Sequence, residues 1–222
     1  NVEMAVEWIK TLFEIAERRH EDVSCLAFKY MTFLFQSIEF PDEFLLSIEN
    51  SFEIFLNNID DEIEEDSNDT IYCDWGLPAF ALFISTYKEK ANFIDYDNAT
   101  TIWCKVFPIW DVNEITDYAF DFLVGLIDER NTAFLDNDNL YRIIDSIIRN
   151  FYMPDFMKEV TKNKMRRALY KLIHDPHFGL KVLEHVQQEQ YNDNDLVVEL
   201  LDPDAAENME NMEIIENDEN SD

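Results

Sequence analysis

Residues 97–129 read DNATTIWCKVFPIWDVNEITDYAFDFLVGLIDE, and this stretch decides the fold class. It contains a polar break at Trp110-Asp111-Val112-Asn113, where Asp and Asn suit a helix N-cap because their side-chain oxygens accept an unpaired backbone N–H. After the break, apolar residues recur at three- and four-residue steps, as on one face of an α-helix. These positions are Ile115, Ala119, Phe122, Leu123, Leu126 and Ile127. We therefore predict a hairpin of two helices, over 97–110 and 113–129.

The same helical periodicity runs through nearly the whole chain, and strand-like alternation is nowhere sustained. Breaks that contain Asp, Asn or Pro divide the chain into consecutive helix pairs with a period of about 40 residues, the length of HEAT-type repeats. The predicted pairs are 2–19 with 21–38, 42–59 with 71–88, 97–110 with 113–129, 137–152 with 157–174, and 177–190 with 194–201. An amphipathic pair cannot bury its apolar stripe alone, so neighbouring pairs must stack. We predict an all-α HEAT-repeat α-solenoid of about five hairpins over residues 1–201. A compact helical bundle would show the same periodicity, and the repeat period favours the solenoid.

Composition excludes several classes of protein. The 222 residues include 48 acids and 17 bases, and the net charge of −31 argues against binding to nucleic acid or to anionic lipid. Hydrophobic residues make up 47% of the chain, which is too much apolar material for a disordered polyanion. Three widely spaced cysteines favour a reducing compartment over a disulfide framework. No apolar run is long enough to span a membrane. The chain begins in mid-pattern without a signal peptide, and we interpret it as a fragment of a longer protein.

Acidic residues are concentrated in two segments outside the predicted helices. Residues 60–69 hold seven acids and no base, and they interrupt the second hairpin. The segment 202–222 is predicted to be an acidic disordered tail, because blocks of like charge repel one another and stay extended. From Asp193 onward there are 12 acids and no base, which leaves 36 acids against 17 bases, a net charge of −19, in the first 192 residues. The helical body is therefore itself strongly negative.

Clustered carboxylates suggest a binding surface for a basic protein, because opposite charge raises association rates and complements Lys/Arg peptides. One cluster is the 60–69 loop, for which a solvated surface insertion is the alternative. The other is a row of acids on the helix predicted over 113–129, which includes Asp128. Aromatic rings beside this row, namely Trp103, Trp110 and Tyr118, could pack Lys/Arg stems, or they could fill the core between repeats. The candidate cargo-binding residues are Asp60, Asp61, Glu62, Glu64, Glu65, Asp66, Trp110, Glu114, Asp117 and Asp121.

One predicted helix, over 157–174, carries six of the 17 bases. They are Lys158, Lys162, Lys164, Arg166, Arg167 and Lys171. An anion-binding patch is one interpretation of this basic cluster. The simpler interpretation is that these bases offset neighbouring acidic helices.

Catalytic and cofactor motifs are missing from the sequence. The three glycines, Gly76, Gly125 and Gly179, are too scattered to form a phosphate-binding loop, and no G-x-S-x-G or H-E-x-x-H motif occurs. The pair His174 and His177 flanks a proline and is typical of a surface turn. We therefore predict no enzyme, no cofactor and no metal site.

The middle of the chain resembles a known family. Trp103 is followed by Phe107-Pro108-Ile109-Trp110, then by acidic residues at Asp111 and Glu114. The next helix continues with Phe120, Phe122-Leu123, Leu126-Ile127 and Asn131. This order resembles the late HEAT repeats of the importin-β (karyopherin-β) nuclear transport receptors, and the importin-β3 subgroup most closely. The resemblance covers roughly residues 75–201, whereas 1–59 match only as generic HEAT hairpins and the acidic tail is an addition.

The resemblance implies the C-terminal part of a nuclear import receptor. Such receptors wrap basic nuclear-localisation signals or basic cargo, contact nucleoporins as they pass the pore, and release cargo when Ran-GTP binds. The family's Ran GTPase-binding elements lie mainly in N-terminal repeats, which this chain should lack. We expect a protein that moves between cytoplasm and nucleus and binds neither nucleic acid nor membrane directly. The alternatives are a HEAT-repeat scaffold, such as a phosphatase regulatory subunit, and an acidic chaperone for basic proteins.

Overall fold

The computed structural model describes residues 2–17, 21–57, 72–90, 94–107, 109, 112–130, 137–152, 157–202 and 204–205. These residues form ten α-helices and two short turns of other helix types, and no strand occurs among them. The α-helices are α1 (Val2–Ala16), α2 (Glu21–Ser37), α3 (Asp42–Asn57), α4 (Leu77–Tyr87), α5 (Tyr96–Val106), α6 (Thr116–Asp128), α7 (Asn137–Phe151), α8 (Glu159–His174), α9 (Gly179–Gln188) and α10 (Asp195–Leu201). A π-helical turn, η1 (Tyr72–Gly76), leads into α4, and a 3-10 turn, η3 (Tyr191–Asp193), precedes α10. The predicted all-α class is confirmed.

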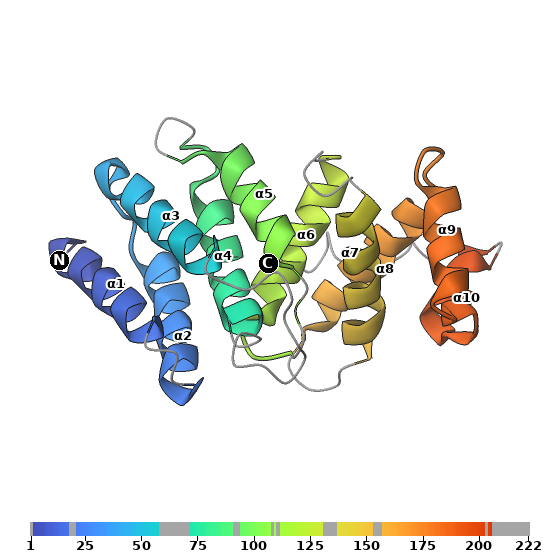
Figure 1. The fold of residues 1–222 in the computed structure, drawn as a ribbon, viewed down its shortest axis with the longest axis horizontal. Helices are drawn as coiled ribbons and strands as arrows, with labels where there is room; N and C mark the ends of the chain where they lie inside the picture. The colour runs from blue at the N-terminus through green and yellow to red at the C-terminus, as the bar shows by residue number, and fades with distance from the viewer. Residues whose placement is uncertain are drawn as a thin grey trace, which may run out of the picture.

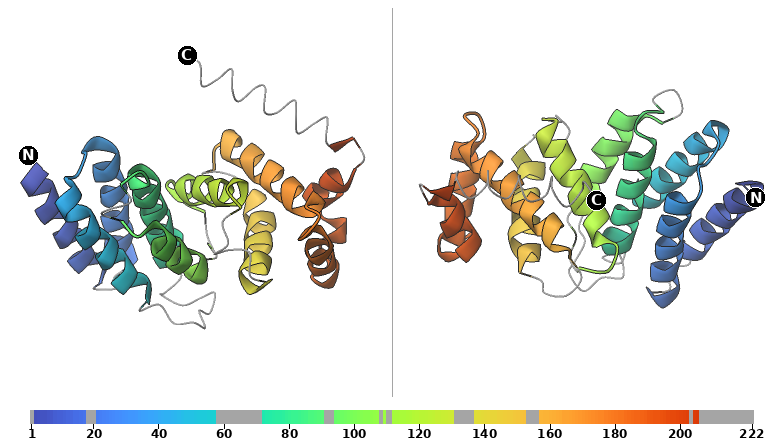
Figure 2. Two further views of the ribbon diagram at one scale, coloured as in Figure 1. Left: turned by 90° about the horizontal axis from the view of Figure 1, so that it is seen from above. Right: turned by 180° about the vertical axis from the view of Figure 1, so that it is seen from behind.

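The helices form a stack of pairs that runs along the long axis of the molecule from α1 to α10 (Figure 1). The second helices of the pairs pack on one another in the order α2, α4, α6, α8, α10, while first helices pack as α1 on α3, α3 on α5, and α7 on α9. Figure 2 shows this second layer from behind, with α8 in front of α7. Extension along one axis agrees with an α-solenoid and not with a compact bundle.

Contacts between successive pairs join residues about one repeat apart. Hydrogen-bonded side chains of neighbouring pairs are separated by 41 residues between Lys88 and Glu129, 43 between Asp121 and Lys164, 43 between Asp128 and Lys171, and 40 between Asp145 and His185. These four contacts bring residues 40 to 43 positions apart next to one another, whereas other contacts have different offsets, such as 85 residues between Lys29 and Glu114. The structure therefore supports the period of about 40 residues that the sequence pattern indicates.

The helix boundaries follow local capping chemistry. Asp95 caps α5 by accepting the backbone N–H of Asn98 at 3.1 Å, and the Asn194 side chain caps α10 by accepting the N–H of Leu196. The helix predicted over 113–129 begins three residues later, at Thr116, because Asn113 forms a turn before it. In that turn the Asn113 backbone N–H donates to Thr116 Oγ1 at 2.8 Å, and Asn113 Oδ1 accepts from the N–H of Ile115.

The core is continuous from the first pair to the last and is rich in aromatic rings. Phe52 of α3 contacts Phe13 of α1 edge-on at 4.8 Å between ring centroids and stacks on Phe80 of α4 at 4.7 Å. Further along, the fully buried Trp103 meets Phe122 edge-on at 5.1 Å, which joins α5 to α6. Burial of these large rings supplies the main driving force for stacking one pair on the next.

Candidate functional site

Much of the predicted cargo-binding set lies outside the described residues. This applies to Trp110, to the acidic tail beyond Ala205, and to the loop residues Asp60, Asp61, Glu62, Glu64, Glu65 and Asp66. The structure does place Glu114, Asp117 and Asp121, which stand before or on α6. These three acids are therefore the part of the site whose geometry can be described.

The acids of α6 form ion pairs with the basic cluster of α8. Asp117 Oδ2 lies 3.4 Å from the Nζ of Lys158, and Asp121 Oδ1 accepts a hydrogen bond from Lys164 Nζ at 2.8 Å. Asp128, about two turns further along the helix, accepts from Lys171. On the other side of α8, Arg166 Nε lies 3.0 Å from Glu199 Oε1 of α10. The interpretation that these bases offset neighbouring acidic helices is confirmed for these four.

Asp117 differs from the other members of this row because its side chain is buried, with 4% exposed, whereas that of Asp128 is 48% exposed. Its Oδ1 also accepts the backbone N–H of Lys158 at 3.2 Å, so the carboxylate tethers the start of α8 to α6. A cargo lysine cannot reach a carboxylate in this position without displacing α8. Asp117 is thus placed as a structural tether, while Asp121 and Asp128 remain half-exposed.

Glu114 and the predicted aromatic residues also have partners within the chain. Glu114 accepts a hydrogen bond from Lys29 of α2. Trp103 is fully buried, and its indole N–H donates to the carbonyl of Leu77 at 3.0 Å, so this ring fills the core between repeats. Tyr118 is half-buried, and Lys158 Nζ lies 5.9 Å from its ring centroid. The Tyr118 ring does pack against a lysine, and this lysine belongs to the same chain.

A small cavity of about 190 Å³ opens beside the same row, between the C-terminal ends of α4 and α6. Its lining residues are Ser85, Lys88, Tyr96, Asp121, Phe122, Gly125 and Glu129. Lys88 donates to Glu129 Oε1 and lies with its Nζ 5.3 Å from the Tyr96 ring centroid. The Tyr96 hydroxyl donates to Glu129 Oε2 at 3.3 Å. Hydrogen bonding to Glu129 raises the pKa of Lys88, so that this lysine stays charged.

A wider cavity of about 440 Å³ lies between the C-terminal ends of α6 and α8. Its charged lining residues are Asp128, Arg130, Lys171, His174 and Asp175. Arg130 pairs with Asp175 at 3.5 Å, and Lys171 pairs with Asp128. Arg130 and Lys171 balance Asp128 and Asp175 here, so this cavity is less suited to a cation than the smaller one, where one lysine faces two carboxylates.

One buried carboxylate is an unpredicted feature of the α3–α5 interface. Glu49 has no exposed surface, and both of its oxygens accept the backbone N–H of Asp95, at 3.0 and 3.1 Å. Burial raises the pKa of Glu49 to about 7, and the nearby carboxylates of Glu53 and Asp95 act in the same direction. The sequence does contain a signal for this burial, because Glu49 falls among Leu45, Ile48 and Phe52 on the apolar face of α3.

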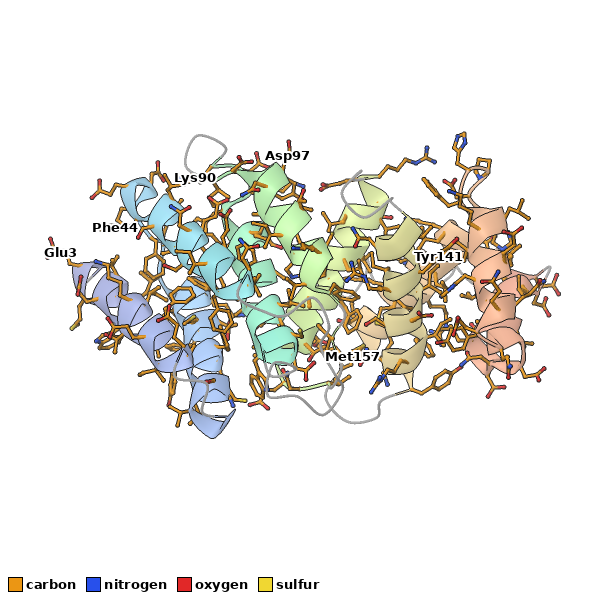
Figure 3. All side chains as sticks on the ribbon, in the orientation of Figure 1. Glu3, Phe44, Lys90, Asp97, Tyr141 and Met157 are labelled. Atoms are coloured by element: carbon orange, nitrogen blue, oxygen red, sulfur yellow. The ribbon has the colours of Figure 1, made fainter. Side chains whose placement is uncertain are left out.

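A polar network joins α7 to α9 near the C-terminal end of the stack. Tyr141, labelled in Figure 3, stacks on His185 with ring centroids 4.4 Å apart. His185 Nε2 lies 2.7 Å from Asp145 Oδ1, and Asp145 also bonds to Tyr191, whose pKa is raised to about 12 chiefly by burial. These contacts join α7 to α9 and to the turn η3.

The first pair carries an apolar groove of about 300 Å³ between α1 and α2. Trp8, Tyr30 and Phe33 line it and are each more than half exposed. Val23 and Leu26 extend the exposed apolar stripe of α2. An exposed apolar stripe of this kind is typical of a surface that packs against another apolar element.

Several other features concern the class of protein. Within the described residues, no group of three or more His, Cys, Asp or Glu side chains is arranged to hold a metal ion. The three cysteines form no disulfide. None of the described helices is long and apolar enough to cross a membrane.

Comparisons with known proteins return no match. No protein-family model matches the chain, and neither the curated proteins nor the solved structures include one that is significantly similar to it.

Proposed function

We propose that the chain is the C-terminal part of an importin-β-type nuclear import receptor of the importin-β3 subgroup, built from HEAT repeats and ending in an acidic tail. The observation that carries this proposal is the α5–α6 pair. Trp103, Phe107, Phe120 and Phe122, which belong to the resembling pattern, all lie in the core of this pair. The polar turn before Thr116 falls between the two helices, as it does in the family's hairpins.

In this proposal the stack is a flexible acidic frame that binds basic cargo, contacts nucleoporins and releases cargo to Ran-GTP. Most contacts in the stack join neighbouring pairs, with the bond from Lys29 to Glu114 as an exception, and a stack of this kind can change its curvature at small cost per interface. Exposed ion pairs such as Asp128–Lys171 contribute little stability individually, so a basic partner can compete for these carboxylates. Asp121 and Asp128 are better placed for such competition than the buried Asp117.

A scaffold function is the second candidate, and the internal ion pairs favour it. Asp117, Asp121 and Asp128 already have cationic partners, as expected of a frame whose charges serve its own packing. A scaffold would bind its partner with little dependence on salt, whereas basic cargo would dissociate as salt rises. The third candidate, an acidic chaperone, places binding in the tail.

Binding of a fluorescein-labelled, lysine-rich localisation peptide to the 222-residue chain separates these candidates. The receptor proposal expects measurable affinity that falls steeply between 50 and 300 mM salt and survives deletion of 202–222. Abolition by that deletion favours the chaperone, and absence of binding contradicts both. Displacement of the peptide from the full-length protein by Ran-GTP then tests the transport function itself.

A further inference from the structure

The cavity of about 190 Å³ between α4 and α6 contains a glycine that packing does not require. Gly125 stands in the interior of α6 and has ordinary helical backbone angles, since no glycine in the described residues has a positive φ. A Cβ built on Gly125 would meet no atom within 4 Å. By contrast, a Cβ on Gly179 would collide with the carbonyl oxygen of Ile173 at 2.3 Å. A glycine in a helix interior costs roughly 1 kcal/mol relative to alanine. The space that a side chain at Gly125 would enter is left open.

The walls of this cavity favour a positive charge. Lys88 and Glu129 are the C-cap residues of α4 and α6, so the negative ends of two helix dipoles face the same place. The carboxylates of Asp121 and Glu129 line the cavity, and the Tyr96 ring offers its π face. Lys88 already makes the contacts expected of a bound cation, because its ammonium lies against the Tyr96 ring and donates a hydrogen bond to Glu129.

We propose that this cavity, named here the Gly125 pocket, binds one lysine or arginine side chain of a basic partner segment. The inference rests on the proposed function and gives it a specific site. Its volume of about 190 Å³ suits one long basic side chain. The incoming cation takes the Asp121 oxygen that does not bind Lys164 and shares Glu129 Oε2 with the Tyr96 hydroxyl, while the aliphatic stem lies over Gly125 and the Tyr96 ring covers the charge. Lys88 is then a resident competitor that the partner's cation must share or displace.

A charge-neutral substitution separates this pocket from general attraction to an acidic protein. Gly125→Leu fills the pocket and leaves the net charge unchanged, and leucine is a good helix former. We expect it to lower the affinity of the lysine-rich peptide about tenfold at 150 mM salt by fluorescence anisotropy, while the urea midpoint of the chain stays equal or rises. A peptide with norleucine in place of lysine should bind weakly and be insensitive to this substitution.

A matched pair of lysine substitutions gives the second test. Lys88→Gln frees Glu129 in the Gly125 pocket, and Lys171→Gln frees Asp128 outside it. Both change the net charge by the same amount. We expect Lys88→Gln to tighten peptide binding three- to tenfold beyond the effect of Lys171→Gln.

The outcomes distinguish the pocket from the function on which it rests. If the unmodified chain binds no lysine-rich peptide, both the proposed function and the pocket are wrong. If it binds the peptide and Gly125→Leu binds equally well with an intact fold, the pocket is wrong and the proposed function stands. Equal effects of Lys88→Gln and Lys171→Gln also overturn the pocket, because they would show attraction by net charge alone.

Discussion

Glu49 of α3 accepts the backbone N–H of Asp95 on both carboxylate oxygens, at 3.0 and 3.1 Å, from within the interface of α3 and α5. The bond satisfies a backbone group at the residue that caps α5, so one buried acid connects two repeats. No base is among the groups that influence its charge, which are the Asp95 N–H and the carboxylates of Glu53 and Asp95. This arrangement makes the junction sensitive to pH.

Replacing Glu49 by glutamine should remove this sensitivity. The pKa of Glu49 is raised from 4.5 to about 7 in the folded chain, so between these values the folded state binds more protons than the unfolded state. The contribution of Glu49 to stability is therefore fully present below pH 4.5, falls as pH rises toward 7, and stays low above it. The loss is on the order of 3 kcal/mol. Glu49→Gln keeps an acceptor for the Asp95 N–H and should be more stable than the unmodified chain at pH 8.

Urea unfolding at pH 5 and pH 8 measures this difference. Glu43→Gln, an exposed position on the same helix, is the matched control and should shift the midpoint equally at both pH values. An unmodified chain and a Glu49→Gln variant with the same pH dependence would contradict the raised pKa.

Alanine substitution of the α6 acids should cost more stability at the buried position than at the exposed one. Asp117→Ala removes a buried carboxylate that accepts the backbone N–H of Lys158 and should destabilise the fold by about 2–3 kcal/mol. Asp128→Ala removes an exposed pair and should cost less than about 1 kcal/mol, with that small effect vanishing in 0.5 M salt. Denaturant unfolding of the two variants at low and high salt makes the comparison. Equal losses for the two would show that Asp117 does not act as a tether.

The sequence predicted the helix pairs well because their apolar spacing is regular. In α7, Leu140, Ile143, Ile144 and Ile147 recur at helical steps and are all buried, as the pattern requires. The start of α6 was less predictable, since Asn113 looks like a helix cap but instead forms a turn with Thr116. Capping residues mark a boundary only to within a turn when two of them compete for it.

The site was harder to predict than the fold because charge pairing depends on which helix faces meet. The row of acids on α6 and the bases of α8 were each visible in the sequence, and an offset of 41 to 43 residues joins them. That offset follows from the repeat period, yet the period alone does not say that Asp117 is buried. The Gly125 pocket has no sequence signal beyond one glycine inside an apolar helix pattern.

Substitution by phenylalanine should destabilise the fold more at Trp103 than at Trp8. Trp103→Phe loses the hydrogen bond to the Leu77 carbonyl and leaves a void in a fully buried site, for an expected loss of about 2–3 kcal/mol. Trp8→Phe, at a position 53% exposed, should change stability by less than about 0.5 kcal/mol. Thermal unfolding followed by circular dichroism compares them. A Trp103→Phe variant as stable as Trp8→Phe would show that the indole N–H and its packing contribute little.

The exposed apolar groove of the first pair leads to a separate prediction about dye binding. Phe33 and Tyr30 lie on the open side of α2 and are 61% and 58% exposed. We expect Phe33→Ser combined with Tyr30→Ser to lower the fluorescence of bound ANS several-fold while stability changes by less than about 1 kcal/mol, because neither ring is buried in the core. The matched control is Leu180→Ser on α9, an exposed apolar residue outside the groove, which should leave the dye signal unchanged. An unchanged ANS signal in the double variant would place the accessible apolar surface elsewhere, whereas a drop accompanied by loss of helicity would show that the stripe supports the first pair itself.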